Sequence, residues 1–270
     1  MTGHVITMLY VSDCMSLLEP GNRLYHYCNL NTALELILPK RQLLLSPINK
    51  TNDPRENKSF VFGSIWNNPK YANSEEWNSK VSEALREDCK VICFSEDNDG
   101  FWGYESSRMW AYYGGNHKGV CLLLDKKKFL EENFGQIEKD YLRSINYFKF
   151  DYNKPIEHKH VDFTEVDRIG FEPYIKNVFR KDNLDYLYFT KNYEWQSEHE
   201  IRLIHFSSNK ENEYCSIRNS LSHIFLGVDF SYSYLPSLIK LCPHVDMSKL
   251  EFKDVKLIPL LSYQGKESNN

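Results

Sequence analysis

The sequence predicts a mixed α+β domain with a split, largely antiparallel sheet and peripheral helices. Short stretches that are apolar or that alternate apolar and polar residues suit strands, and they are separated by segments with helical spacing. These segments vary in length and give no strict strand–helix–strand rhythm, which favours a mixed sheet. Tyrosine (18) and phenylalanine (16) are abundant, and aromatic side chains favour strands.

The domain organisation follows from chain length and from the absence of sequence breaks. A chain of 270 residues fits one large domain or two small ones, and it shows no repeat and no convincing linker. We predict a peripheral N-terminal arm over residues 1–22, ending at the Pro-Gly pair of positions 20 and 21. One α+β domain over residues 23–262 and a polar tail over residues 263–270 complete the chain.

The first half of the domain is expected to hold four strands and four helices. The expected strands are residues 24–28, 42–46, 90–96 and 118–125, and the last is the clearest buried strand. The expected helices run to residue 38 and over residues 74–87, 109–113 and 126–133. Asn31 or Thr32 should cap the first helix and Pro39 should stop it, because proline cannot donate a backbone hydrogen bond.

The second half is expected to alternate in the same irregular way. The expected strands are residues 145–152, 200–206, 224–228 and 255–261. A helical region is expected after the polar stretch 153–162 and up to about Tyr188, and another helix over residues 234–242.

Composition limits the functional classes. The net charge of −4 gives no global attraction to nucleic acid or to an anionic membrane. The seven cysteines form no Cys-x-x-Cys pair, and Cys93 and Cys121 lie in apolar runs, as is typical of a reducing compartment. The N-terminus lacks a basic signal-peptide region, and no run approaches the roughly 18 apolar residues of a membrane helix. A cytoplasmic protein without a membrane partner is predicted.

Several common active-site motifs are absent from the sequence. The nine histidines are scattered, and the one close pair, His158 and His160, has no carboxylate or cysteine at a zinc spacing. The chain has no Walker loop, no Gly-x-Ser-x-Gly and no Gly-x-Gly-x-x-Gly. We therefore predict no metal, and no P-loop NTPase, α/β-hydrolase or dinucleotide-binding Rossmann domain.

Four sequence pieces occur in an order that is typical of one family. They are LYHY at 24–27 with LLLSPINKTNDP at 43–54, VICFSE at 91–96, MWAYYGGNHKGVCLLLD at 109–125 and WQSEHEIRLI at 195–204; IFLGVD at 224–229 also fits. Over about residues 24 to 261 the chain resembles the bacterial domain-of-unknown-function family 2971. That family has no settled activity, so this resemblance implies an architecture and candidate positions but no reaction.

The order of elements is also similar to that of ADP-ribosyltransferases of the His–Tyr–Glu kind. The matching positions are His26, Tyr112 or Tyr113, and Glu198 with Glu200, although the aromatic piece here precedes its strand on an expected helix. This similarity implies an ADP-ribosyltransferase or NAD glycohydrolase that uses NAD as substrate, with Glu200 catalytic and Glu198 orienting the acceptor. The acceptor is open: protein, nucleic acid or small molecule. Such an enzyme would suit a toxin or phage-defence effector.

The segment from Glu198 to Arg202 is the strongest candidate by its own chemistry. On a strand, Glu198, Glu200 and Arg202 share one face, with the carboxylates roughly 7 Å apart, while Ile201 and Leu203 face the core. A carboxylate beside a breaking N-glycosidic bond stabilises oxocarbenium character. The alternatives are a solvated strand face or, on a helix, an ordinary i,i+4 ion pair.

Two further candidates lie on short segments nearer the N-terminus. His26, beside Tyr27, can bond a ribose because neutral imidazole offers a donor and an acceptor; alternatively it is a satisfied, partly buried histidine. Asp53 can line the site mouth, or it can simply stabilise the turn before Pro54.

An aromatic and polar cluster precedes the buried strand 118–125. Trp110, Tyr112 and Tyr113 can stack a nicotinamide or adenine ring, or they can be the core face of a short helix. Trp195 and Arg202 complete the set of ligand-binding candidates.

Two other functional classes remain open. One is a non-catalytic ligand-binding or sensor domain, in which Trp195, Glu198 and Arg202 are structural or grip a ligand. The other is a metal-independent nuclease acting through His and Glu, which predicts basic walls around the same cleft. The transferase hypothesis requires His26, Tyr112 or Tyr113, and Glu200 to converge on one cleft large enough for a dinucleotide.

A nucleic-acid surface is a further hypothesis. The basic residues Lys126 to Lys128, Arg143, Lys149 and Lys154 are interleaved with Tyr147, Phe148 and Tyr152. A charged helix followed by an exposed strand face explains the same residues and is the simpler interpretation.

Overall fold

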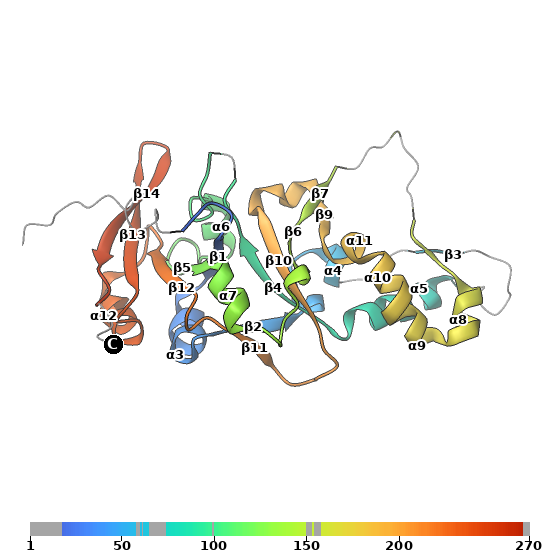
Figure 1. Cartoon of the computed structure of the whole chain (residues 1–270). Coiled ribbons are helices and arrows are strands. Elements are labelled where there is room, and N and C mark those ends of the chain that lie inside the picture. The colour runs from blue at the N-terminus through green and yellow to red at the C-terminus, as the bar shows by residue number, and fades with distance from the viewer. Residues whose placement is uncertain are drawn as a thin grey trace, which may run out of the picture.

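A computed structural model gives the structure of the protein and describes residues 18–57, 60, 62–64, 74–98, 100–149, 153 and 158–266. The fold is mixed α+β, as predicted: ten strands of the described residues form one mostly antiparallel sheet with helices around it (Figure 1). Most of the expected arm, residues 1–17, and the end of the expected tail, residues 267–270, lie outside the described residues.

The large sheet crosses the molecule from the β13–β14 hairpin at one end to the strands beside the helical end (Figure 1). Its main path is β11 (Glu213–Ser216), β2 (Gln42–Pro47), β4 (Cys89–Ser95), β1 (Arg23–Cys28), β5 (Val120–Asp125), β12 (Leu221–Leu226), β13 (Asp246–Lys253) and β14 (Lys256–Tyr263). Off this path, β10 (Glu200–Phe206) pairs with β4, and β6 (Leu142–Ser144) pairs with β10. Two small parallel pairs are β3 (Gly63–Ser64) with β8 (His160–Val161) and β7 (Asn146–Phe148) with β9 (Thr190–Asn192).

The sheet is split along one edge of β4. On its other edge β4 pairs with β10 over its whole length, from Ser95 to Cys89. On the split edge, β1 pairs with β4 only at Ser95, and β2 pairs with it only at Val91 and Lys90. The middle of β4 therefore faces a gap between β1 and β2, and this gap positions the candidate site.

The helices cover both the sheet and its far end. They are α2 (Leu30–Thr32), a π-helical segment (Ala33–Ile37), α3 (Leu38–Lys40), α4 (Pro54–Asn57), α5 (Ser74–Arg86), α6 (Ser107–Tyr112), α7 (Lys126–Glu132), α8 (Phe163–Ile169), α9 (Phe171–Pro173), a second π-helical segment (Tyr174–Phe179), α10 (Arg180–Asp182), α11 (Leu184–Tyr188) and α12 (Leu235–Leu241). Short 3-10 turns are Ile48–Lys50, Lys139–Tyr141, η6 (Tyr193–Glu198) and Tyr232–Tyr234. Among the described residues, no helix is long and apolar enough to cross a membrane.

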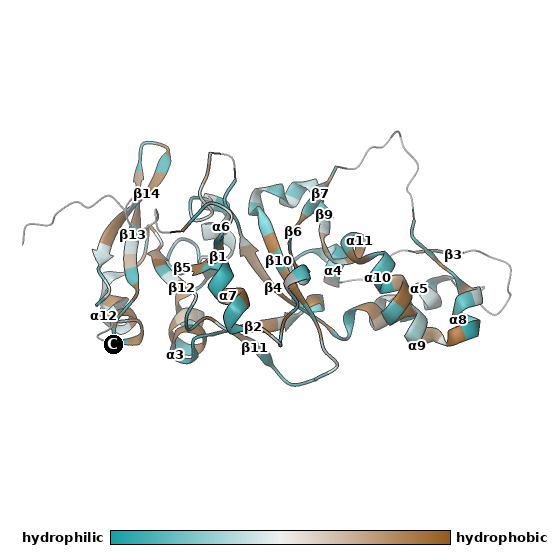
Figure 2. Ribbon diagram, in the orientation of Figure 1, coloured by the Kyte–Doolittle hydropathy of each residue, from teal (hydrophilic) through white to brown (hydrophobic). Residues whose placement is uncertain are grey.

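Three apolar clusters hold these layers together. The largest joins β1, β4, β5, β10 and β12 to α7 through residues such as Leu122 and Phe129. A second packs α5, α8 and the following helices against the other side of β4 and β10, and a small aromatic cluster around Trp110 fixes α6. Hydrophobic residues accordingly follow β4 through the interior, whereas α7 shows a hydrophilic face to solvent (Figure 2).

The first helical segment corrects two predictions. Its cap is Asn29, whose side chain accepts from Thr32 N, and not Asn31 or Thr32. Pro39 does not stop the helix, because it lies in the first turn of α3, where no backbone donor is required. The helix ends instead at Arg41, which has the left-handed backbone (φ 53°).

The strand expected over residues 145–152 is also different. Within it, β7 covers Asn146–Phe148, and residues 150–152 lie outside the described residues. The strand β6 precedes β7 and is separated from it by Ile145, whose N donates to Glu200 O at 2.8 Å. Because β6 pairs with β10 and β7 with β9, the chain crosses here between two partners. The strands β11 and β13 were not predicted, because polar residues interrupt their strand pattern.

Candidate functional site

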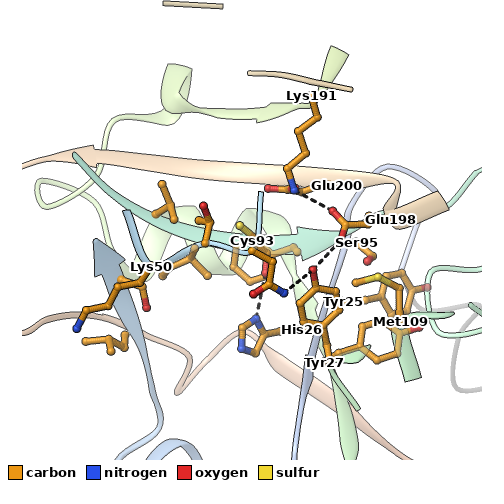
Figure 3. Close-up of a pocket in the computed structure, with 18 residues that line it drawn as sticks. Tyr25, His26, Tyr27, Lys50, Cys93, Ser95, Met109, Lys191, Glu198 and Glu200 are labelled. Atoms are coloured by element: carbon orange, nitrogen blue, oxygen red, sulfur yellow. Dashed lines mark hydrogen bonds and ion pairs between the residues drawn. The ribbon is translucent and has the colours of Figure 1, made fainter. Parts of the chain in front are cut away.

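A pocket of about 240 Å³ occupies the gap between β1 and β2 (Figure 3). Its base is the middle of β4, its sides come from β1 and β2, and the loop after β2 lies at its more exposed side. Residues of α6, β9, η6 and β10 close it. The lining residues are Tyr25, His26, Tyr27, Leu44, Ser46, Lys50, Thr51, Asn52, Val91, Ile92, Cys93, Phe94, Ser95, Met109, Tyr113, Lys191, Glu198 and Glu200.

One wall is charged, and Lys191 is at its centre. The Lys191 ammonium lies 2.8 Å from Glu198 Oε2 and 2.5 Å from Glu200 Oε2 (Figure 3). Tyr113 Oη donates to the other oxygen of Glu198 at 2.7 Å, and Asn52 donates to Tyr113 Oη at 3.2 Å. We call Tyr113, Lys191, Glu198 and Glu200 the charged wall.

The charged wall continues into the protein interior through Arg202. Arg202 Nε lies 2.6 Å from Glu200 Oε1, and its NH1 lies 2.6 Å from Glu56 Oε1 and 3.0 Å from Tyr188 O. The side chains of Arg202 and Glu56 are buried. Since a buried ion loses its hydration, these groups depend on one another for compensation.

The expected shared strand face is only partly correct. Glu200 and Arg202 do lie on β10, but Glu198 ends η6, and His199 with its left-handed backbone (φ 42°) separates the two segments. Lys191, rather than strand geometry, brings both carboxylates together. Neither simpler alternative holds, because the face is buried and Arg202 bonds Glu200 and Glu56 rather than Glu198.

Protonation in the charged wall is fixed by these pairings. Burial alone would raise the pKa of Glu200, but Arg202 and Lys191 outweigh it and lower this pKa to about 2. Burial alone would lower the pKa of Lys191, but Glu200 and the neighbouring carboxylates outweigh burial and raise this pKa. Burial, with Glu198, raises the pKa of Tyr113, so at neutral pH the phenol keeps its proton.

The opposite wall, formed by Tyr25, His26 and Tyr27 of β1, is uncharged. His26 Nδ1 lies 3.1 Å from Cys93 O, and since a carbonyl only accepts, Nδ1 carries the proton and Nε2 is left as an acceptor. Burial lowers the pKa of His26, so the ring is neutral at pH 7. Tyr27 Oη donates to Gly103 O at 2.6 Å. We call these three residues the neutral wall.

Ser95 lies in the pocket where the two walls approach each other. It pairs with Tyr25 of β1 on one side and with Glu200 of β10 on the other. Its buried Oγ has no hydrogen-bond partner among the described residues. A buried hydroxyl without a partner is costly unless a ligand or water completes it.

Five of the ten predicted site residues line the pocket together: His26, Tyr27, Tyr113, Glu198 and Glu200. The convergence that the transferase hypothesis requires is only partial. Ser95 pairs with both Tyr25 and Glu200, so these three side chains share one face of the sheet. His26 points to the opposite face, where its ring packs on Phe94. The volume is smaller than the roughly 300–1,000 Å³ of common ligand sites, so it is small for a whole dinucleotide.

The other five predicted residues lie outside the pocket lining. Trp110 is fully buried and donates to Tyr104 O at 2.8 Å, whereas Tyr112 is 74% exposed. Asp53 is buried and accepts from Arg55 N at 2.9 Å. Trp195 supports Lys191, whose Nζ is 5.4 Å from the ring centre, and Arg202 lies behind Glu200.

Sequence reasoning missed Lys191, Glu56 and Ser95. A single lysine in the polar segment before Trp195 carries no motif, and its role arises only where β9 meets β10. The sequence contained one signal for the buried partner of Arg202. Glu56 lies three residues after Asp53, and a carboxylate close to a turn can pair with a buried cation. Within the described residues, no three His, Cys, Asp or Glu side chains are grouped to hold a metal ion.

One comparison with known proteins finds a match over part of this site. Residues 109–203 match the family described as Protein of unknown function (DUF2971). This region carries the whole charged wall and Arg202 but not His26, and it is shorter than the 24–261 expected from sequence pieces. No curated protein and no solved structure matches the chain, so nothing here supports similarity to ADP-ribosyltransferases.

Proposed function

We propose that the pocket cleaves the bond between nicotinamide and ribose in NAD and passes ADP-ribose to water or to an acceptor. The observation that carries this proposal is a carboxylate, Glu198, in the same pocket as the Ser95 hydroxyl, which has no partner among the described residues, with the Tyr113 phenol donating to that carboxylate. In the reaction the C1′–N bond breaks and its electron pair goes to the nicotinamide nitrogen. Water or an acceptor then adds to C1′ and loses a proton.

Glu198 is the better candidate for the catalytic carboxylate. Both oxygens of Glu200 are held by Arg202 and Lys191, and its side chain is only 3% exposed. The Glu198 side chain is 10% exposed, and one of its oxygens bonds Tyr113, a neutral donor that a ligand hydroxyl can replace. Glu198 thus supplies negative charge beside the developing oxocarbenium ion, and Glu200 with Lys191 positions it. The similarity to ADP-ribosyltransferases implied that Glu200 is the catalytic carboxylate, and this proposal gives that role to Glu198 instead.

The remaining groups suit one end of the dinucleotide. Ser95 Oγ can donate to the ligand or accept from a ribose hydroxyl. Because the pocket is small, the nicotinamide riboside end enters it and the adenosine diphosphate half extends along the exposed side, past Lys50 (Figure 3). Such an enzyme would suit a toxin or phage-defence effector acting in the cytoplasm.

The experiment is nicotinamide release from NAD, followed by mass spectrometry with cell lysate and nucleic acids as added acceptors. Wild type should release nicotinamide, and Glu198→Gln should lower the rate by about 100-fold or more, in the range for loss of one transition-state electrostatic group. Tyr112→Phe is the matched control, because Tyr112 is on the same helix but outside the pocket lining. Folded wild type that releases no nicotinamide under any of these conditions rules the proposal out.

A non-catalytic binding site is the second candidate. It is favoured because the carboxylates of the charged wall are already fully paired within the protein. Every oxygen of Glu198 and Glu200 already has an internal partner, as in a structural network. This alternative predicts that calorimetry detects ligand binding to wild type without nicotinamide release.

The nuclease hypothesis required basic walls around the pocket. Two carboxylates neutralise Lys191, which leaves Lys50 as the unopposed lysine in the lining.

A further inference from the structure

A surface of exposed aromatic rings and cations borders the charged wall. Its members are Arg108 of α6, Phe148 and Lys149 at the end of β7, and Tyr193 of η6, and we call it the η6 surface. Phe148 is 60% exposed and Tyr193 is 46% exposed, although such large rings usually lose surface on folding. Two exposed rings and two cations therefore lie on elements that border the pocket.

The geometry of the η6 surface comes from the parallel β7–β9 pair, whose strands lie side by side near β10 (Figure 1). Phe148 is in register with Asn192, so its ring is placed beside the start of η6. Lys149 Nζ lies 5.7 Å from the centre of the Tyr193 ring. A ring and an ammonium are therefore presented together to solvent.

The η6 surface connects directly to the pocket. At its other end Arg108 NH1 donates to Ser197 Oγ at 3.2 Å, which joins α6 to η6. The next residue, Glu198, is the carboxylate of the charged wall. On the β7 side, Tyr147 Oη accepts from Glu200 N at 2.8 Å, so the segment that carries Phe148 is tied to the same site.

We propose that the η6 surface binds single-stranded nucleic acid. Exposed rings stack on unpaired bases without sequence preference, while Lys149 and Arg108 neutralise the phosphates between them. A duplex hides its base faces and cannot use the rings in this way. The exposed Glu194 lies in the same segment and opposes phosphate, which moderates affinity. The inference does not depend on NAD cleavage; with that activity, a base beside Glu198 becomes the acceptor.

The chain offers a matched control for this proposal. At the other end of the sheet, Lys249 Nζ lies 4.7 Å from the ring centre of Tyr232, which is also about half exposed. This pair has the same chemistry as Lys149 and Tyr193 but is not part of the pocket lining. If only the Lys149–Tyr193 pair contributes to binding, its position beside the pocket is what matters. If both pairs contribute equally, any exposed lysine–tyrosine pair is sufficient.

The test is fluorescence anisotropy with labelled 20-nucleotide DNA and RNA single strands and the DNA duplex, at several salt concentrations. Wild type should bind a single strand at least tenfold more tightly than the duplex, and Tyr193→Ala should weaken this binding at least tenfold. Lys149→Gln should weaken it and lower its salt dependence, and Glu194→Gln should strengthen it. Tyr232→Ala and Lys249→Gln should stay within twofold of wild type.

Three results overturn the proposal: no single-strand binding by folded wild type at low salt, equal affinity for duplex, or equal losses in the two lysine–tyrosine pairs. Thermal melting of each variant confirms that it is folded. None of these measurements uses NAD, so their failure is distinct from failure of the proposed cleavage.

Discussion

The two walls of the pocket differ in how they are built. The neutral wall comes from consecutive residues of β1, and ordinary strand pairing holds it in place. The charged wall takes one residue, Tyr113, from the C-terminal end of α6 and the others from β9, η6 and β10, and their mutual pairing holds them together. Because buried ions must be compensated by their partners, the ion-paired residues of the charged wall and Arg202 behind them should contribute more to stability than the neutral wall does.

Arg202→Ala should give the largest effect. It leaves the carboxylates of Glu200 and Glu56 buried without their common partner, and removal of one member of a buried ion pair costs about 3–5 kcal/mol of unfolding free energy. Urea denaturation measures this change. Arg168→Ala, in the exposed pair with Glu165, is the control and should show no measurable change. Equal stabilities for the two variants would mean that the buried network is not needed for folding.

Acid should weaken the charged wall next. The folded-state pKa of Glu200 is lowered from 4.5 to about 2, so its contribution to stability is present above pH 4.5 and is lost as pH falls toward 2. The shift corresponds to about 3 kcal/mol. Denaturation of wild type and Glu200→Gln between pH 7 and 2.5 should show the difference between them shrinking as the pH falls. A constant difference contradicts the assigned pKa.

His26→Phe tests the neutral wall and should have a smaller effect. It removes the donor to Cys93 O while keeping an aromatic ring against Phe94, so we expect a loss of about 1–2 kcal/mol. Because the pKa of His26 is lowered, the folded protein disfavours the protonated ring, and acid below pH 6.5 destabilises wild type through this residue. The variant should lack that contribution. A loss as large as that of Arg202→Ala would remove the distinction between the walls.

Tyr113→Phe should have the smallest effect on stability. It removes the phenol hydrogen bond to the Glu198 carboxylate. Because Tyr113 is only half-buried, water can replace the phenol, and Lys191 still pairs the carboxylate, so the expected loss is about 1 kcal/mol. Differential scanning calorimetry should record a small fall in the melting temperature. A large fall would show that Tyr113, and not Lys191, holds Glu198 in place.

The strands and part of the site were predictable from local patterns. The apolar runs at 90–96 and 118–125 gave β4 and β5, because a strand buried on both faces needs a continuous apolar sequence. His26, Tyr113 and Glu198 were found because each lies in a distinctive piece of sequence. Lys191 was not found, since the reason for its position is a contact between β9 and β10 that no local pattern encodes. The left-handed turn at His199 likewise moved Glu198 off the strand against expectation.

The most direct test of the central claim is to measure nicotinamide release by Glu198→Gln and Glu200→Gln side by side, with the folded fraction of each known. We predict that Glu198→Gln loses release and loses less stability than Glu200→Gln, because the Glu198 carboxylate is the more exposed of the two. Glu200→Gln should lose stability, and its folded fraction should retain measurable release. If Glu198→Gln retains the wild-type rate and Glu200→Gln abolishes it without loss of stability, the assignment of Glu198 as the catalytic carboxylate is contradicted.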